Sequence, residues 1–125
     1  MNALNYPKMC YSQPDASLRS TRSIEYEALA RATRLLTAAW PNRKHDLASL
    51  ANALNENRLL WSTLAADVAS SENGLPAPLR AQLFYLYEFT EQHSRIVLEG
   101  RGSIEVLVDI NTAVMRGLRG QGGAT

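Results

Sequence analysis

Apolar residues recur along the chain at intervals of three and four positions, the spacing that places side chains on one face of an α-helix. The first such segment runs from about Ser23 to Trp40, with Ser23 as a suitable N-cap and Pro41 as a residue that cannot continue a helix. Its apolar positions are Ala28, Ala32, Leu35, Leu36 and Ala39. The pattern therefore predicts a helix over residues 23–40.

A second helical pattern begins near Asp46, another good N-cap, and continues to about Ala69. Its apolar positions form two stripes of the same phase, separated by the polar run 55–58. The stripes are Leu47, Leu50, Ala51 and Leu54, and then Trp61, Leu64, Ala65 and Val68. Asparagine is a mediocre helix former but not a breaker, so residues 55–58 are compatible with either a continuous helix or a kink. A turn composition over 70–74 ends the segment, and Gly74 suits a positive φ there.

Two further helical patterns follow along the chain. One begins after Pro76 and Pro78, since proline is tolerated in a first helical turn, and it ends before Gly100. Its main face consists of Leu79, Leu83, Leu86, Thr90, His93 and Val97. The other begins with Ser103 as N-cap. Its stripe consists of Ile104, Leu107, Val108, Asn111, Val114, Met115 and Leu118.

The connections between these four patterns are short, and no segment alternates between apolar and polar residues with a period of two. Short connections favour antiparallel neighbours. The sequence therefore predicts an all-α fold, a small antiparallel bundle of about four helices, with a single domain over residues 22–119. Residues 1–21 contain two prolines and lack periodicity, which predicts an extended or disordered arm. Residues 120–125 are rich in glycine, which predicts a flexible tail.

Composition narrows the class of protein. The chain has 125 residues, enough for one domain, and its 46% hydrophobic and 20% charged residues are typical of a soluble globular protein. No signal-like or 18-residue apolar run occurs, so we expect a cytoplasmic protein that does not engage a membrane. Thirteen Lys and Arg against twelve Asp and Glu leave a net charge of +1, which disfavours a dedicated nucleic-acid binder. The single cysteine excludes a disulfide framework within the chain.

Enzymatic chemistry finds little support in the side chains. His45 and His93 fall on different predicted elements, and no metal-binding or phosphate-binding motif accompanies them. His93 lies on the predicted core face of its helix, where a partly buried, hydrogen-bonded histidine is expected. We therefore expect a protein that is not an enzyme, with no catalytic, metal or cofactor-binding residues and no cofactor.

Several polar residues interrupt or flank the apolar stripes. A buried Asn111 must find partners for its amide, and a neighbouring helix end or the turn at 73–74 is the partner we expect. Arg58 and Arg80 are expected to bind backbone carbonyls or a carboxylate such as Asp67, because helix ends leave carbonyls unsatisfied. We interpret five residues as a structural polar set: Arg58, Asp67, Asn73, Arg80 and Asn111.

The third helical pattern carries more apolar surface than one core face requires. Tyr85, Tyr87 and Phe89 stand at alternate positions, so they cannot all face the same way. A helix that is apolar nearly all round is either central in the bundle or covered by a partner, and the sequence supports both readings equally. Trp61 likewise suits either a core position or a binding hot spot.

The order and spacing of several short motifs resemble the FlaF family, small flagellar biosynthesis regulators of alphaproteobacteria. The motifs are Glu25-Tyr26, Thr33-Arg34, Asn57-Arg58-x-x-Trp61-Ser62-x-Leu64-x-x-Asp67, Asn73-x-Leu75-Pro76, Leu79-Arg80-Ala81, Ile110-Asn111 and Gly117-Leu118. They span residues 17–118 approximately, and no single one of them is diagnostic. The N-terminal arm and the glycine-rich tail lie outside the resemblance.

The resemblance implies a non-enzymatic cytoplasmic protein that binds flagellin as a secretion chaperone and acts alongside the regulator FlbT in controlling flagellin translation. We expect a hydrophobic groove between helices that takes an amphipathic helix from a terminal segment of flagellin. The candidate flagellin-binding residues are Trp61, Leu64, Phe84, Tyr85, Tyr87 and Phe89.

The alternative is a post-transcriptional regulator that acts on flagellin mRNA directly or through FlbT. Its support from the residues is four arginines near the first helix, which are Arg19, Arg22, Arg31 and Arg34. An exposed face of mixed charge explains these arginines more simply. RNA binding through them would weaken steeply with salt, whereas groove binding of an apolar helix would not.

Overall fold

The computed structural model of the protein describes the backbone of residues 14–123 and the side chains of residues 25–118. This part of the chain forms four α-helices and no strand, which confirms the predicted all-α class. The helices are α1 (Pro14–Ala39), α2 (Leu47–Ala69), α3 (Ala77–Leu98) and α4 (Glu105–Gly123). A single 3₁₀ turn, η2 (Trp40–Asn42), follows α1. In the described residues no helix is long and apolar enough to cross a membrane.

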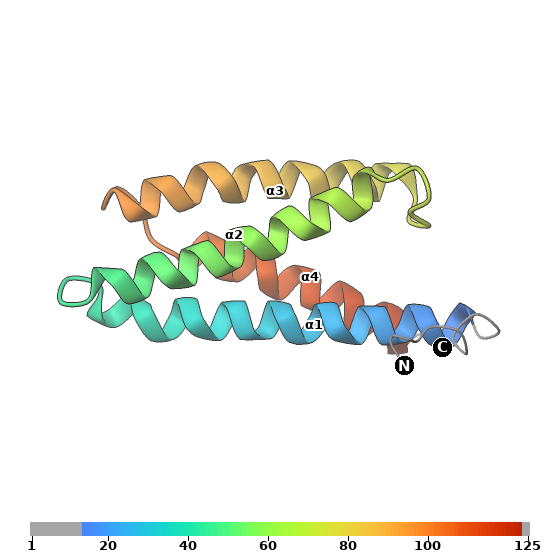
Figure 1. Ribbon diagram of the computed structural model, residues 1–125, viewed down its shortest axis with the longest axis horizontal. Coiled ribbons are helices and arrows are strands. Elements are labelled where there is room, and N and C mark those ends of the chain that lie inside the picture. The colour runs from blue at the N-terminus through green and yellow to red at the C-terminus, as the bar shows by residue number, and fades with distance from the viewer. Residues whose placement is uncertain (1–13, 124–125) are drawn as a thin grey trace, which may run out of the picture.

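The four helices do not pack equally with one another. α2 packs against both α1 and α3, and α4 packs along α1. α3 and α4 make few contacts and diverge from the short connection that joins them, as Figure 1 shows. The bundle is therefore open between the N-terminal half of α3 and the C-terminal half of α4.

Both ends of the bundle depart from the predicted boundaries. α1 begins at Pro14, so Ser23 lies inside the helix rather than at its N-cap, and residues 14–21 of the predicted arm are helical. Proline fits the first turn of a helix because its missing N–H has no intrahelical partner there. α4 likewise continues to Gly123, so residues 120–123 of the predicted tail are helical. The remaining parts of the arm and tail, 1–13 and 124–125, lie outside the described residues.

α2 begins where the sequence predicts and has no break. The Asp46 carboxylate accepts a hydrogen bond from the backbone N–H of Ser49 at 3.1 Å, which confirms its N-cap role, and the Ser49 hydroxyl donates to the same carboxylate at 2.7 Å. The helix is continuous through residues 55–58, so the alternative of a kink there is wrong. Asn57 lies within this run and is fully buried, because the polar segment turns one amide toward the helices it packs against.

The Asp46 cap makes stability depend on pH. The Ser49 hydroxyl, and then the Ser49 backbone N–H, lower the pKa of Asp46 below its ordinary 3.8, because both hydrogen bonds favour the carboxylate. A lowered pKa in the folded state gives stability that is present above about pH 3.8 and is lost as pH falls through the folded pKa. We expect Asp46→Ala to lower the melting temperature at pH 7, with a smaller difference from the wild type at pH 2.5. Circular dichroism melts measure this, with the exposed Asn52→Ala as the control, and an Asp46→Ala difference independent of pH would contradict it.

The connection between α3 and α4 is a tight turn. The N–H of Gly100 donates to the carbonyl of Val97 and the N–H of Arg101 donates to that of Ile96, both at 3.0 Å, in the pattern of a Schellman cap. The positive φ, 80°, belongs to Gly100. The prediction of a positive φ at Gly74 is wrong. The Ser103 hydroxyl accepts from the N–H of Glu105 at 3.1 Å, so Ser103 does bind the start of α4.

The apolar core lies at the end of the bundle that carries the α1–α2 and α3–α4 connections. It draws one or more side chains from every helix, which are Leu36, Leu50, Ala53, Leu54, Val97, Ile104 and Leu107. Trp61, Leu64, Ala65 and Val68 continue the buried face of α2 toward the opposite end. At that opposite end α3 and α4 have separated.

Candidate functional site

A buried polar cluster joins three helices at the middle of the bundle. The indole N–H of Trp61 donates to Oδ1 of Asn111 at 2.9 Å. The amide nitrogen of Asn111 donates to Oδ1 of Asn57 at 2.8 Å and to the Thr33 hydroxyl at 3.1 Å. The Thr33 hydroxyl in turn donates to the carbonyl of Leu29 at 2.7 Å. Asn111 is thus fully satisfied inside the core, and the prediction that it would cap a helix end or the turn at 73–74 is wrong.

The two predicted arginines bind the groups expected of them by type. Arg80 donates to the carbonyls of Leu75 at 3.2 Å and Val68 at 3.4 Å, so it ties the end of α2 to the start of α3. Arg58 forms an ion pair with Glu91 of α3 at 2.9 Å. Neither arginine binds Asp67, the carboxylate expected for them; Asp67 instead accepts from the amide of Asn73.

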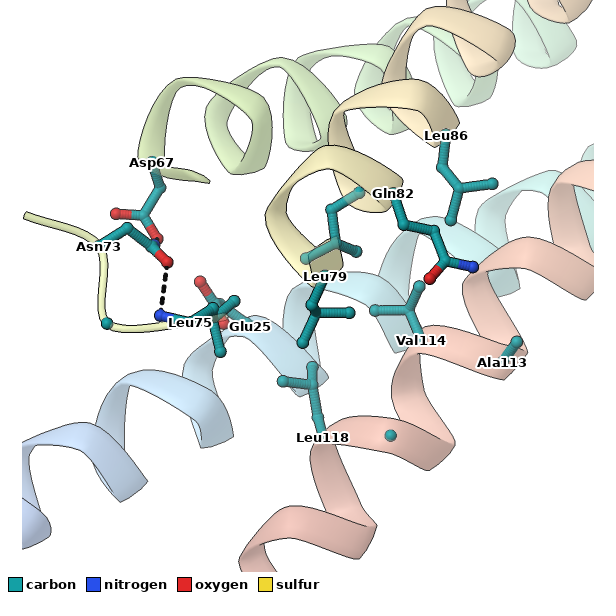
Figure 2. Close-up of a pocket in the computed structure, with 13 residues that line it drawn as sticks. Glu25, Asp67, Asn73, Leu75, Leu79, Gln82, Leu86, Ala113, Val114 and Leu118 are labelled. Atoms are coloured by element: carbon teal, nitrogen blue, oxygen red, sulfur yellow. Dashed lines mark hydrogen bonds between the residues drawn. The ribbon is translucent and has the colours of Figure 1, made fainter. Parts of the chain in front are cut away.

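Asp67 and Asn73 shape the loop between α2 and α3. The amide nitrogen of Asn73 donates to Oδ2 of Asp67 at 3.2 Å, and Oδ1 of Asn73 accepts from the N–H of Leu75 at 2.9 Å. Figure 2 shows this second bond, with the Leu75 side chain beside Glu25 of α1. These residues therefore place one apolar side chain at the edge of the opening between α3 and α4.

That opening is an apolar groove of about 380 Å³. We call it the α3–α4 groove. Its walls are mainly leucines of α3 and small or branched residues of α4, and Glu25 of α1 and the α2–α3 loop close one end (Figure 2). The principal apolar lining residues are Leu75, Leu79, Leu83, Leu86, Val114 and Leu118. Its described polar lining residues are Glu25, Asp67, Asn73 and Gln82.

The width of the apolar face on α4 explains why the groove is apolar. At about 100° per residue, the apolar positions of α4 cover more than half of its circumference, which is more than packing on α1 requires. Ile104, Leu107 and Asn111 are buried in the bundle, whereas Val114 and Leu118 are only half-buried and line the groove. Periodicity places all of these residues in one apolar stripe and carries no signal for the divergence of α3 from α4.

The six predicted flagellin-binding residues occupy three different environments. Trp61 is 0% exposed and Leu64 is 9% exposed, so a partner that docks on this structure does not reach them. Phe84 is 38% exposed and packs edge-on against Tyr87, with ring centroids 5.6 Å apart. Both lie near the side of α3 that carries Glu91, which faces α2.

Tyr85 and Phe89 lie on the groove side of α3. They follow Gln82 at helical spacing, and Gln82 lines the groove. Phe89 stacks on His93 at 5.5 Å between ring centroids, and Nε2 of His93 lies 2.8 Å from the carbonyl oxygen of Ser103, before α4. His93 is thus the partly buried, hydrogen-bonded residue that the sequence predicts. Tyr85 is 64% exposed, and none of the six predicted binding residues is among those that line the groove.

The groove is suited to binding rather than to bond-making chemistry. Its described polar groups are two carboxylates and two amides, gathered mostly at one end, around a floor of leucine and valine. His45 is exposed on the loop before α2, away from this lining. No group of three or more His, Cys, Asp or Glu in the described part of the chain could hold a metal ion.

Comparison with protein families identifies the class. Residues 7–118 match the family described as flagellar protein FlaF, which covers most of the chain. The chain therefore belongs to the FlaF family, a flagellar accessory and regulatory family, as its sequence motifs indicated. The chain has no significant match among curated proteins or among solved structures. Its role is accordingly flagellar. The α3–α4 groove is the surface of the described structure that is suited to binding a partner.

Proposed function

We propose that the protein binds flagellin as a cytoplasmic secretion chaperone, taking an amphipathic helix from a terminal segment of flagellin into the α3–α4 groove. The observation that carries this proposal is the groove itself, an apolar surface between two helices of a flagellar family protein. Terminal segments of flagellin form amphipathic helices in the filament, so before export their apolar stripes require cover.

The dimensions and chemistry of the groove fit such a helix. Leu79, Leu83 and Leu86 stand at i, i+4 and i+7 along about two turns of α3, which is the repeat of an amphipathic helix partner. Val114 and Leu118 supply the matching wall on α4. A helix laid between these walls would bury its apolar stripe and leave its polar face in water, which removes the surface that drives premature polymerisation.

The alternative of a regulator acting on flagellin mRNA, directly or through FlbT, has weaker support. Arg31 is paired with Glu56 at 3.5 Å, so its charge is partly compensated within the protein. Arg34 is exposed, and the side chains of Arg19 and Arg22 lie outside the described residues. Binding to FlbT remains compatible with the proposal, because a chaperone bound to flagellin can also report its level to a regulator.

The test is binding of purified protein to monomeric flagellin, measured by isothermal titration calorimetry. We expect a one-to-one complex in the micromolar range or tighter for the wild type. Leu79→Glu places a charge in the groove and should abolish binding, because a buried unpaired carboxylate is strongly unfavourable. Leu59→Glu is the matched control, because Leu59 is 60% exposed on α2 and does not line the groove.

Two results would overturn the proposal. One is the absence of wild-type binding at tens of micromolar. The other is a Leu79→Glu variant that is folded by circular dichroism and still binds flagellin as the wild type does. A separate titration with flagellin mRNA tests the alternative, since RNA binding through the arginines would weaken steeply between 50 and 500 mM salt.

A further inference from the structure

The charges along the α3–α4 groove are distributed asymmetrically. Among the described lining residues only Glu25 and Asp67 carry formal charge, and both are acidic. Figure 2 places both of them at the end formed by α1 and the α2–α3 loop, whereas the opposite end, around Leu86 and Ala113, is uncharged and carries the Gln82 amide. An elongated ligand therefore meets two different ends, one that carries two carboxylates and one that is uncharged.

The α4 wall of the groove has a second feature, a glycine that the fold does not require. Gly117 lies inside α4, where glycine is less favourable than alanine. Its φ is not positive, and a Cβ built on it would meet no atom within 4 Å. Neither backbone conformation nor a neighbouring group within the described chain accounts for it. Its missing side chain instead leaves open space on the groove side of α4.

Ala113 lies one turn before Gly117 and also lines the groove. The α4 wall therefore carries small residues at two consecutive turns, whereas the α3 wall opposite carries leucines. Interaxial distances between packed helices are set by the side chains at the contact, and small residues there allow the closest approach. A helix in this groove would sit close to the α4 backbone at Gly117 and be pressed there by the leucines of α3.

We propose, resting on the function proposed above, that the groove selects both the direction and the composition of the flagellin helix. The bound segment is an amphipathic helix with Lys or Arg at one end of its apolar stripe. That basic end lies beside Glu25 and Asp67, and the helix crosses α4 at Gly117. Charge complementarity of this kind fixes register and suppresses the reversed arrangement, in which the carboxylates would face an apolar end.

The first test uses the glycine. Gly117→Ala removes a glycine from a helix and meets no neighbour, so the free protein should be at least as stable as the wild type. We expect it nevertheless to bind flagellin about 5- to 10-fold more weakly, and Gly117→Leu more than about 50-fold more weakly. The control is Arg116→Ala, an exposed neighbour that does not line the groove and should bind normally.

The second test removes the two charges without changing shape. In Glu25→Gln/Asp67→Asn, the new Asn side chain keeps an oxygen that can accept from Asn73. We expect flagellin binding about 10-fold weaker at 50 mM salt, and a weaker salt dependence than that of the wild type. Glu105→Gln is the matched control, because Glu105 is exposed at the other end of α4. A synthetic flagellin peptide whose basic end residues are changed to Glu should lose the same share of affinity.

The outcomes separate this inference from the function on which it rests. If wild-type protein does not bind flagellin, the proposed function fails and this inference with it. If the wild type binds and Leu79→Glu does not, the function stands. In that case, wild-type affinity for both Gly117→Leu and the Glu25/Asp67 double variant would overturn the present inference alone.

Discussion

Replacing Asn111 with alanine is expected to lower the free energy of unfolding by about 3–5 kcal/mol. The substitution leaves the Trp61 indole N–H and the Asn57 carbonyl oxygen buried without the partner that each has in the wild type. Each buried group deprived of its partner costs about 1–3 kcal/mol, and the lost side-chain volume adds to this. Urea unfolding followed by tryptophan fluorescence measures the change.

Thr112→Ala is the matched control for Asn111→Ala. Thr112 is the next residue of α4, is half-buried, and donates only to the carbonyl of Val108 within its own helix. Its loss should cost about 1 kcal/mol or less. A loss below about 1 kcal/mol for Asn111→Ala would show that the polar cluster contributes little. Trp61→Phe gives an independent measure, because it removes the donor while keeping most of the buried ring.

Replacing Leu107 with alanine is expected to cost about 2–5 kcal/mol. Leu107 is fully buried where α4 meets the core residues of α1 and α2, Leu36, Leu50 and Leu54 among them. Removal of its side chain forfeits the transfer free energy and leaves a cavity that helices fixed by two short connections cannot fully close. Thermal and urea unfolding give the value.

The neighbour Val106 provides the comparison for Leu107. It is half-exposed, so Val106→Ala should cost clearly less than Leu107→Ala, at about 1 kcal/mol or below. Equal losses for the two variants would mean that burial in the core is not what attaches α4 to the bundle. Flagellin binding by Leu107→Ala, measured well below its melting temperature, should be retained, because Leu107 does not line the groove.

Local signals in the sequence predicted the elements well where they were chemically strong. The Asp46 cap and the prolines before α3 each determine a helix start within one turn, and both appear where predicted. The helix boundaries that were predicted wrongly, the start of α1 and the end of α4, carry weaker signals. Nothing apolar and periodic distinguishes residues 14–22 from a disordered arm, although Pro14 is itself compatible with a first helical turn.

The groove was harder to predict than the helices, for a physical reason. Periodicity shows that Leu79 and Val114 lie on apolar faces, but not how far apart two such faces stand. That distance depends on the connection at Gly100 and on the way α3 follows α2 while α4 follows α1. For the same reason Trp61 and Asn111 were assigned separate roles, since their hydrogen bond joins residues fifty positions apart.

The contact between α2 and α3 has a consequence for the mechanics of the bundle. The hydroxyls of Thr90 and Ser94 on α3 are buried without a hydrogen-bond partner, as is the amide nitrogen of Asn57 on α2. Each such group weakens the contact relative to an apolar one. α1, α2 and α4 share the polar cluster, whereas α3 packs mainly on α2 and makes few contacts with α4. The position of the α3 wall, and with it the width of the groove, is therefore set mainly by how α3 packs on α2.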